Sequence, residues 1–147
     1  MKITPEELVL FGLAPGSPLP QGGKPLVLTL RSNSGSAQIH TDRLAPMVRT
    51  LFGIELYPGS LNLWSEAPLE WERPMPVSTG DYPAGQCCPV ILEEVAVGLA
   101  FRANSDTPTF LEVLSPVCLR EHISNRHDGA SIPIRLLAGS ELRPRTK

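Results

Sequence analysis

The stretch that decides the fold is residues 89–101, PVILEEVAVGLAF, in which two apolar runs flank a pair of glutamates. A short apolar run bounded by polar residues is typical of a buried strand. Because only Glu93 and Glu94 separate the two runs, we expect a tight turn to reverse the chain there. The stretch therefore predicts a β-hairpin with strands at residues 89–92 and 95–101.

Other short runs along the chain predict further strands. They lie at residues 26–30, 111–114 and 130–137, while residues 61–64 alternate apolar and polar side chains as a half-buried strand does. Residues 44–52 instead repeat apolar side chains three and four apart, which is the spacing of a helix. Six or seven strands with two short helices predict a mainly β fold, a small six-stranded β-barrel with helices in its connections.

The connections between these elements are rich in turn-forming residues. Residues 66–86 contain four prolines and are expected to form a loop. A short helix is expected at residues 117–123, because Ser115 suits its cap and Pro116 its first turn. The tail, residues 141–147, is expected to be frayed.

Composition narrows the classes of protein to which the chain can belong. Its 147 residues include 16 prolines and 12 glycines, about a fifth of the total, which argues against long helices. The 41% of hydrophobic residues is too high for a disordered chain. No apolar run reaches the roughly 18 residues that a membrane span needs. We expect one domain over residues 1–147.

Charge and cysteine usage indicate the surroundings in which the protein works. The net charge of −2, from 13 basic and 15 acidic residues, argues against a general nucleic-acid binder. Residues 1–10 lack the apolar core of a signal peptide, and the three cysteines are an odd number. These features predict reduced thiols, a cytoplasmic location, and neither nucleic acid nor membrane as a partner.

The sharpest local feature is residues 57–63, YPGSLNL, in which a Pro-Gly turn leads straight into a predicted strand. Ser60 and Asn62 are two residues apart, so in an extended chain they point to the same side. Their hydroxyl and amide oxygens are neutral, hard ligands, which Mg²⁺ accepts when a nucleotide phosphate supplies negative charge. The alternative is that both residues only satisfy the turn.

Two weaker signals accompany this turn. Residues 32–37, SNSGSA, follow a predicted strand, and Gly35 and Ser36 could let backbone N–H groups approach a phosphate, although a solvated loop is the alternative. Glu112 is the one charge in an apolar run, residues 110–114. A carboxylate on a strand that faces a pocket could accept a proton from a hydroxyl, whereas one that faces solvent would have no such role.

A metal site built on cysteine is not predicted. Cys118 and His122 are four residues apart and would share one face of the expected helix. The adjacent Cys87 and Cys88 do not match the paired spacing of structural zinc ligands. Cys118 is therefore expected in the core and His122 on the surface.

Two of these stretches together resemble a known family. Residues 51–63, LFGIELYPGSLNL, resemble the Gly-Phe-x-Pro-Tyr-Pro-Gly-Thr-Leu-Asn-Leu segment of the archaeal CTP-dependent riboflavin kinases. Residues 111–121, LEVLSPVCLRE, resemble that family's Leu-Glu-Ile-Ile-Ala-Pro-x-x-Leu-Arg segment. The order and spacing agree over about residues 26–137, including an Asp-Gly turn at residues 128–129 before a final strand.

The resemblance implies a six-stranded cradle-loop barrel that transfers the terminal phosphate of CTP to riboflavin with Mg²⁺, giving FMN. Ser60 and Asn62 stand where the family has the Thr and Asn that serve the metal and the phosphates. Pro58 and Gly59 belong to the same nucleotide-binding motif. Glu112 matches a glutamate near the flavin, which implies the base that accepts the proton of the riboflavin 5′-hydroxyl.

The family's phosphate loop differs from the corresponding residues here. That loop is Gly-x-Gly-x-Gly-like, and only Gly35, with Ser36 beside it, falls on a family glycine, whereas Asn33 stands where another should be. A side chain replaces hydrogen where the backbone must meet phosphate. This difference keeps a second hypothesis open, in which the barrel binds a flavin or another small ligand without turnover.

Overall fold

The computed structural model describes residues 3–31, 37–79, 82–103, 109–124 and 126–145. Its strands are β1 (Lys24–Leu30), β2 (Leu61–Trp64), β3 (Met75–Thr79), β4 (Tyr82–Leu92), β5 (Ala96–Ala103), β6 (Phe110–Leu114) and β7 (Ser131–Leu136). Its helices are α1 (Pro5–Val9) and α2 (Ala37–Phe52), and its short 3-10 turns are η1 (Leu119–Glu121) and η2 (Gly139–Glu141).

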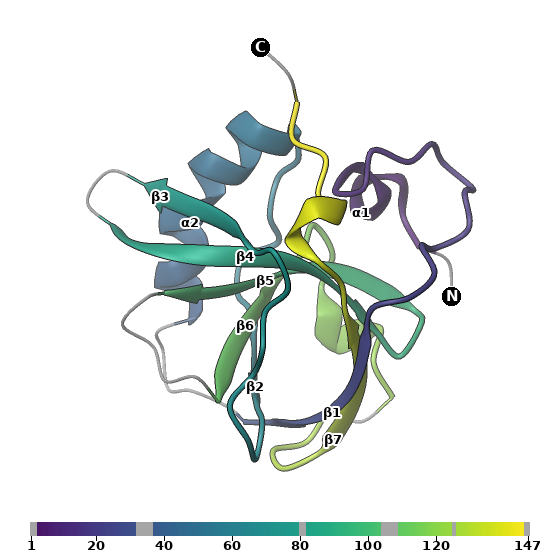
Figure 1. Ribbon diagram of the computed structural model, residues 1–147, viewed down its shortest axis with the longest axis vertical. Coiled ribbons are helices and arrows are strands. Elements are labelled where there is room, and N and C mark those ends of the chain that lie inside the picture. The colour runs from purple at the N-terminus through teal and green to yellow at the C-terminus, as the bar shows by residue number, and fades with distance from the viewer. Residues whose placement is uncertain (1–2, 32–36, 80–81, 104–108, 125, 146–147) are drawn as a thin grey trace.

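Six of these strands close into an antiparallel barrel (Figure 1). Their order is β4-β5-β6-β2-β1-β7, and β7 pairs back with β4, where Val90 lies opposite Leu136 and Leu92 opposite Ile134. The remaining strand, β3, pairs with β4 outside the closed ring. The prediction of a mainly β chain with a six-stranded barrel is therefore confirmed.

The predicted hairpin forms the longest seam of this barrel. Strands β4 and β5 pair from Gly85 opposite Ala103 to Leu92 opposite Ala96. At the turn, Glu93 and Glu94 have φ angles of 49° and 58°, the left-handed conformation that a tight hairpin turn requires. Glu93 accepts a hydrogen bond from the Ser124 backbone N–H at 2.8 Å, and Glu94 accepts one from Arg135 Nε at 2.7 Å. The two carboxylates thus tie the strained turn to neighbouring segments.

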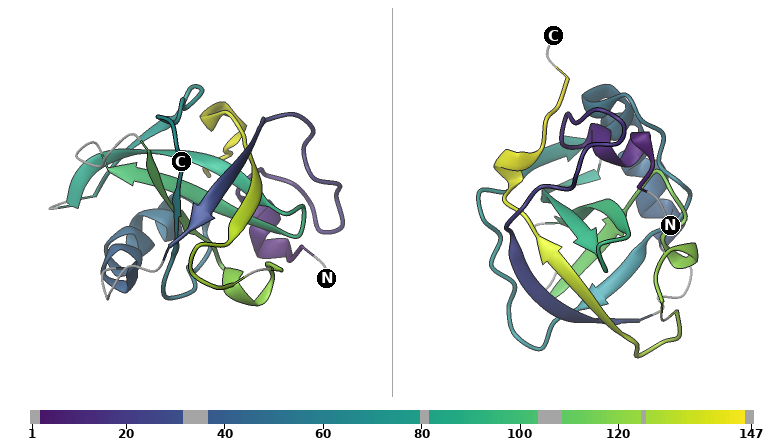
Figure 2. Two further views of the ribbon diagram at one scale, coloured as in Figure 1. Left: turned by 90° about the horizontal axis from the view of Figure 1, so that it is seen from below. Right: turned by 90° about the vertical axis from the view of Figure 1, so that its right-hand side faces the viewer.

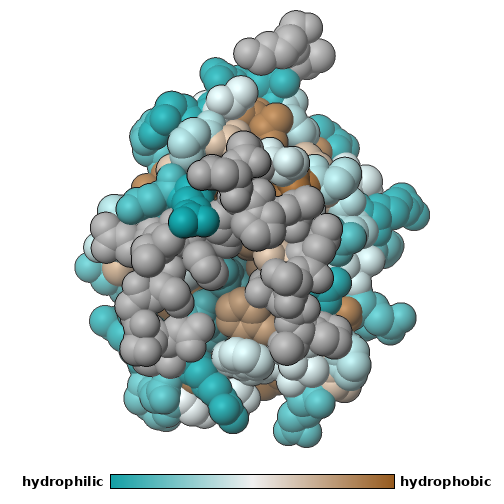
Figure 3. Space-filling view, turned by 90° about the vertical axis from the view of Figure 1, so that its left-hand side faces the viewer, coloured by the Kyte–Doolittle hydropathy of each residue, from teal (hydrophilic) through white to brown (hydrophobic). Residues whose placement is uncertain are grey.

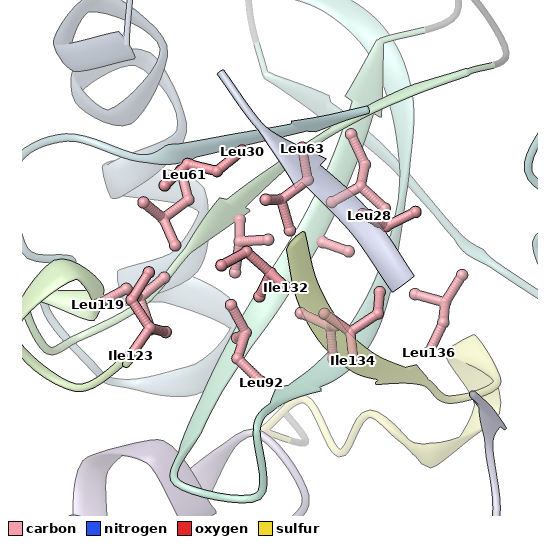
Figure 4. Close-up of a cluster of buried hydrophobic side chains, with 14 of the residues drawn as sticks. Leu28, Leu30, Leu61, Leu63, Leu92, Leu119, Ile123, Ile132, Ile134 and Leu136 are labelled. Carbon is pink, nitrogen blue, oxygen red and sulfur yellow. The ribbon is translucent and has the colours of Figure 1, made fainter. Parts of the chain in front are cut away.

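Two hydrophobic clusters form on opposite faces of the strands, because successive side chains of a strand alternate in direction. One cluster fills the interior of the barrel (Figure 4) and includes Leu28, Leu30, Leu61, Leu63, Leu111, Val113, Ile132 and Ile134. The other lies outside the ring, where Leu44, Val48 and Phe52 of α2 join Cys87, Val97, Leu99, Phe101 and Leu114. Helix α2 therefore covers the outer face of the hairpin.

Although the ends marked N and C lie apart in both views of Figure 2, segments close to them in the chain meet. The backbone N–H of Arg143 donates to the carbonyl of Leu10 at 2.9 Å, so the C-terminal segment runs beside the residues that follow α1. On the described surface, the large hydrophobic side chains that are exposed are Val27 and Tyr57. Figure 3 accordingly shows a face on which hydrophilic residues predominate. Neither helix in the described ranges combines the length and hydropathy needed to cross a membrane.

Three expectations about the connections are wrong. Residues 66–86 contain β3 and the first part of β4, because β3 pairs along one side only and such a strand tolerates Pro76. The segment after β6 forms only the single turn η1 instead of a helix over residues 117–123. The tail is not frayed through residue 145, since Leu142 is buried and the backbone N–H of Arg145 bonds to Leu51.

We expect Gly98→Ala to destabilise the barrel. A Cβ at Gly98 would lie 2.4 Å from Val113 Cγ1 and 2.9 Å from the Leu114 carbonyl oxygen, so β5 and β6 would have to move apart. Overpacking of this kind costs about 1–3 kcal/mol. Urea unfolding should show the lower midpoint, with the exposed Ser131→Ala as control. Equal midpoints for the two variants would contradict the close packing.

Candidate functional site

A small cleft lies where two distant stretches of the chain meet. One wall is the turn before β2 and the other is the segment after β6, and the backbone N–H of Tyr57 joins them by donating to the Ser115 carbonyl at 2.8 Å. The residues that line the cleft are Tyr57, Pro58, Gly59, Ser60, Leu61, Ser115, Val117, Cys118, Leu119 and Arg120. These are parts of the two stretches that the sequence singled out.

The size of the cleft limits what it can enclose. Its volume is about 90 Å³, well below the roughly 300–1,000 Å³ of pockets that surround a whole small molecule. By itself it accommodates a group of the size of a phosphate or part of a ring. The half-buried Arg120, whose Nη1 donates to the Arg126 carbonyl at 3.2 Å, places a positive charge in its lining.

The turn residues shape one wall of this cleft. Gly59 has a φ of 108°, a value that side-chain-bearing residues rarely adopt and that fits the third position of the predicted type II turn. Apart from Gly59 and its two chain neighbours, no heavy atom of the described residues lies within 4 Å of where a Cβ at Gly59 would be. The turn is therefore open on that side, where a ligand could approach Gly59.

Ser60 connects this wall to a buried carboxylate. Its Oγ donates a hydrogen bond to Oε2 of Glu112 at 3.1 Å, although the two residues are 52 positions apart in the chain. Glu112 is only 1% exposed, and burying a carboxylate is costly unless it is hydrogen-bonded. Because the Ser60 hydroxyl gives its hydrogen to Glu112, its oxygen lone pairs are directed elsewhere and can accept a proton or bind a cation.

Asn62 lies beside this pair on the outer face of the barrel. Leu61 and Leu63 belong to the interior cluster, so Asn62 between them points outward, and it is 5% exposed. Asn62 is directly opposite Glu112 in the pairing of β2 with β6. The structure thus brings Ser60, Asn62 and Glu112 together.

The predicted site residues differ in how they meet the cleft. Among the described residues, Ser60 belongs to its lining, whereas Asn62 and Glu112 do not, so the carboxylate is reached through the Ser60 hydroxyl. Gly35 and Ser36 lie outside the described residues. The hydroxyl, amide and carboxylate oxygens of Ser60, Asn62 and Glu112 are hard donors of the kind that Mg²⁺ accepts.

Sequence reasoning missed that Cys118 and Arg120, from the second of the two stretches, line the cleft. Cys118 was expected in the core, but it is partly exposed and lines the cleft, and this prediction is wrong. His122 was expected on the surface, but it is half-buried with Nδ1 2.9 Å from the Cys118 carbonyl oxygen. Cys118 is the N-cap residue of the single turn η1 and lies in the lining of the cleft. The signal in the sequence was the resemblance of residues 111–121, which include Cys118.

The surroundings of Tyr57 in the cleft and of two cysteines in β4 raise the pKa values of these groups, for different reasons. A hydrogen bond with the Cys118 thiol is the main cause that raises the pKa of the Tyr57 hydroxyl above its ordinary value. Burial in β4 raises the pKa of the Cys88 thiol to about 12, and raises that of Cys87 further. Within the described ranges, no group of three or more His, Cys, Asp or Glu side chains is arranged to hold a metal ion.

Neither a protein-family model nor a curated protein sequence matches this chain.

We expect the three cysteines to differ sharply in reactivity. Cys118 lines the cleft, whereas Cys87 and Cys88 are buried and stay protonated because of their raised pKa values. In the folded protein, dithiobis(nitrobenzoate) should titrate Cys118 alone, and in denaturant all the thiols should react. Cys118→Ser is the control and should abolish the native reaction. Rapid native reaction of Cys87 or Cys88 would contradict their burial.

Proposed function

We propose that the protein transfers the terminal phosphate of CTP, or of another nucleoside triphosphate, to riboflavin with Mg²⁺, as the resemblance to the archaeal riboflavin kinases implies. The observation that carries the proposal is the hydrogen bond from Ser60, in the cleft, to the buried Glu112, with Asn62 opposite. These residues stand at the positions to which the resemblance assigns the metal, the phosphates and the proton transfer. Their proximity supports a common role.

The nucleotide end of the proposed site consists of groups that bind anions or hard cations. Ser60 and Asn62 would hold Mg²⁺ through their oxygens, and when bound the ion would neutralise charge on the transferring phosphate. The backbone of Pro58 and Gly59 would lie against the phosphates, together with Gly35 and Ser36 as the resemblance implies. Phosphoryl transfer needs chiefly the positioning of the reactants and the stabilisation of charge, and contacts of this kind supply both.

Glu112 would receive the proton that the acceptor hydroxyl loses. Because Ser60 lines the cleft and Glu112 does not, the proton would pass to the Ser60 oxygen while the Ser60 hydrogen moves to the carboxylate. The existing hydrogen bond already has the direction that this transfer requires. The roles of the two residues are therefore coupled, and removing either should impair the same step.

A second function is favoured by one specific observation, Asn33 in place of a family glycine in the stretch that resembles the phosphate loop. A side chain at that position hinders the approach of the backbone to phosphate, which supports a module that binds riboflavin or another small ligand without turnover. Calorimetric titration with CTP plus Mg²⁺ and then with riboflavin distinguishes the two. Binding of both ligands, followed by FMN formation, supports the kinase. Riboflavin binding alone supports the module, and binding of neither contradicts both.

We expect Asn62→Ala to lower the rate of FMN formation by at least about tenfold, because a metal ligand would be lost. Glu112→Gln should lower it as well, since an amide cannot accept the proton. Turnover is measured by chromatographic separation of FMN, and thermal unfolding establishes that each variant is folded. The exposed Ser131→Ala serves as the control. Unchanged turnover in Asn62→Ala would contradict the assignment of the site.

A further inference from the structure

The short helix α1 contains a buried carboxylate that has no part in the function proposed above. Glu7 is 0% exposed. Its Oε1 accepts hydrogen bonds from the backbone N–H of Thr4 at 2.8 Å and from Thr4 Oγ1 at 3.0 Å, which completes the cap of the helix. Its Oε2 accepts a hydrogen bond from the backbone N–H of Val97 in β5 at 2.6 Å. Both carboxylate oxygens of Glu7 therefore have hydrogen-bond partners, and Oε2 joins α1 to strand β5 of the barrel.

Val97 is held by a second side chain where β5 extends past the end of β6. The pairing of β5 with β6 begins at Leu99, opposite Leu114. Beyond that point the backbone of Val97 bonds to side chains instead of to β6. Its N–H donates to Glu7, and its carbonyl accepts a hydrogen bond from Ser115 Oγ at 2.8 Å. The side chains of these two buried residues thus satisfy the backbone groups of Val97 that β6 does not reach.

Ser115 is also the residue that joins the two walls of the cleft. Its carbonyl accepts the hydrogen bond from the Tyr57 N–H at 2.8 Å, and its Oγ accepts one from the Val117 N–H at 3.3 Å. Tyr57 and Val117 line opposite walls. A continuous series of hydrogen bonds therefore runs from Glu7 through the Val97 backbone and Ser115 to both walls.

We propose that Glu7 is a positioning residue for the cleft. By holding the Val97 backbone it fixes Ser115, and Ser115 sets the separation of the Tyr57 and Val117 walls. The N-terminal helix is thus part of the site although it does not touch it. This role of Glu7 rests on the proposed function only where its effect is measured with CTP. Its effect on the geometry of the cleft can be measured without a ligand.

The test compares Glu7→Leu, which removes both acceptors, with Glu7→Gln, which keeps one acceptor oxygen for Val97. Thr4→Ala is the matched control, because it weakens the cap of α1 and leaves the acceptor of Val97 in place. Two readouts report the cleft in the free protein: the rate at which Cys118 reacts with dithiobis(nitrobenzoate), and the amide chemical shifts of Tyr57 and Ser60.

Glu7→Leu should raise the rate of the Cys118 reaction by at least about fivefold, the lower end of coupling between sites, and should shift both amides. Glu7→Gln should restore most of the wild-type behaviour, and Thr4→Ala should leave both readouts unchanged. If Glu7→Leu lowers stability but leaves the rate and the shifts as in wild type, or if Thr4→Ala matches it, Glu7 is merely structural and the proposal is overturned.

Ser115→Ala provides a second test if Glu7→Leu does not fold. Combined with Glu7→Ala, which also removes both acceptors but introduces a smaller side chain, its effects on the Cys118 rate should be non-additive, because both residues act through Val97. Additive effects would count against the series of contacts. With CTP and Mg²⁺, Glu7→Ala should raise KM more than it lowers kcat. Wild-type protein that fails to bind CTP would contradict the proposed function while leaving the ligand-free measurements able to decide the role of Glu7.

Discussion

The rest of the structure depends on one edge of β4, which pairs with two different strands along its length. One edge of this long strand pairs with β5, while the other pairs with β3 along its first part and with β7 at residues 90–92. The pairing with β7 closes the barrel, and the pairing with β3 uses the part that extends beyond it. Gly139 lies where the chain leaves β7, and a Cβ there would come within 2.2 Å of the Arg73 carbonyl oxygen. The close approach of the segment after β7 to the segment before β3 therefore needs glycine at this position.

A closed ring of strands separates an interior from an exterior, and this separation places the site. The interior is filled with aliphatic side chains, so a polar group on β2 or β6 can be buried only on the outer face. Asn62 and Glu112 are opposite each other on that face, and Ser60 supplies a hydrogen bond to the carboxylate. The cost of removing the carboxylate from water is offset by such hydrogen bonds.

The two ends of the described chain secure the elements that cover the barrel. Arg145 donates to the carbonyls of Arg49 and Thr50 at 3.0 and 3.2 Å, and thereby places positive charge at the carboxyl end of α2. At the other end, Glu7 bonds to the backbone of Val97. The contact from Glu7 helps to hold the five-residue α1, which is too short to be a stable helix alone.

The sequence by itself determined the local elements. It placed the hairpin, predicted β2 at residues 61–64 and the Pro-Gly turn before it, and identified Ser60, Asn62 and Glu112 as candidates. Apolar spacing and turn chemistry act between neighbouring residues, so these features can be recognised without knowing the rest of the fold.

Only the tertiary structure decided how distant segments meet. It placed β3 and the first part of β4 within the proline-rich residues 66–86 and held the tail through residue 145. It also placed Cys118 at the cleft and joined Ser60 to Glu112 across 52 positions. None of these features follows from local preference, because each exists through a partner that closure of the barrel brings near. The hydrogen bond that carries the proposed function is of this second kind.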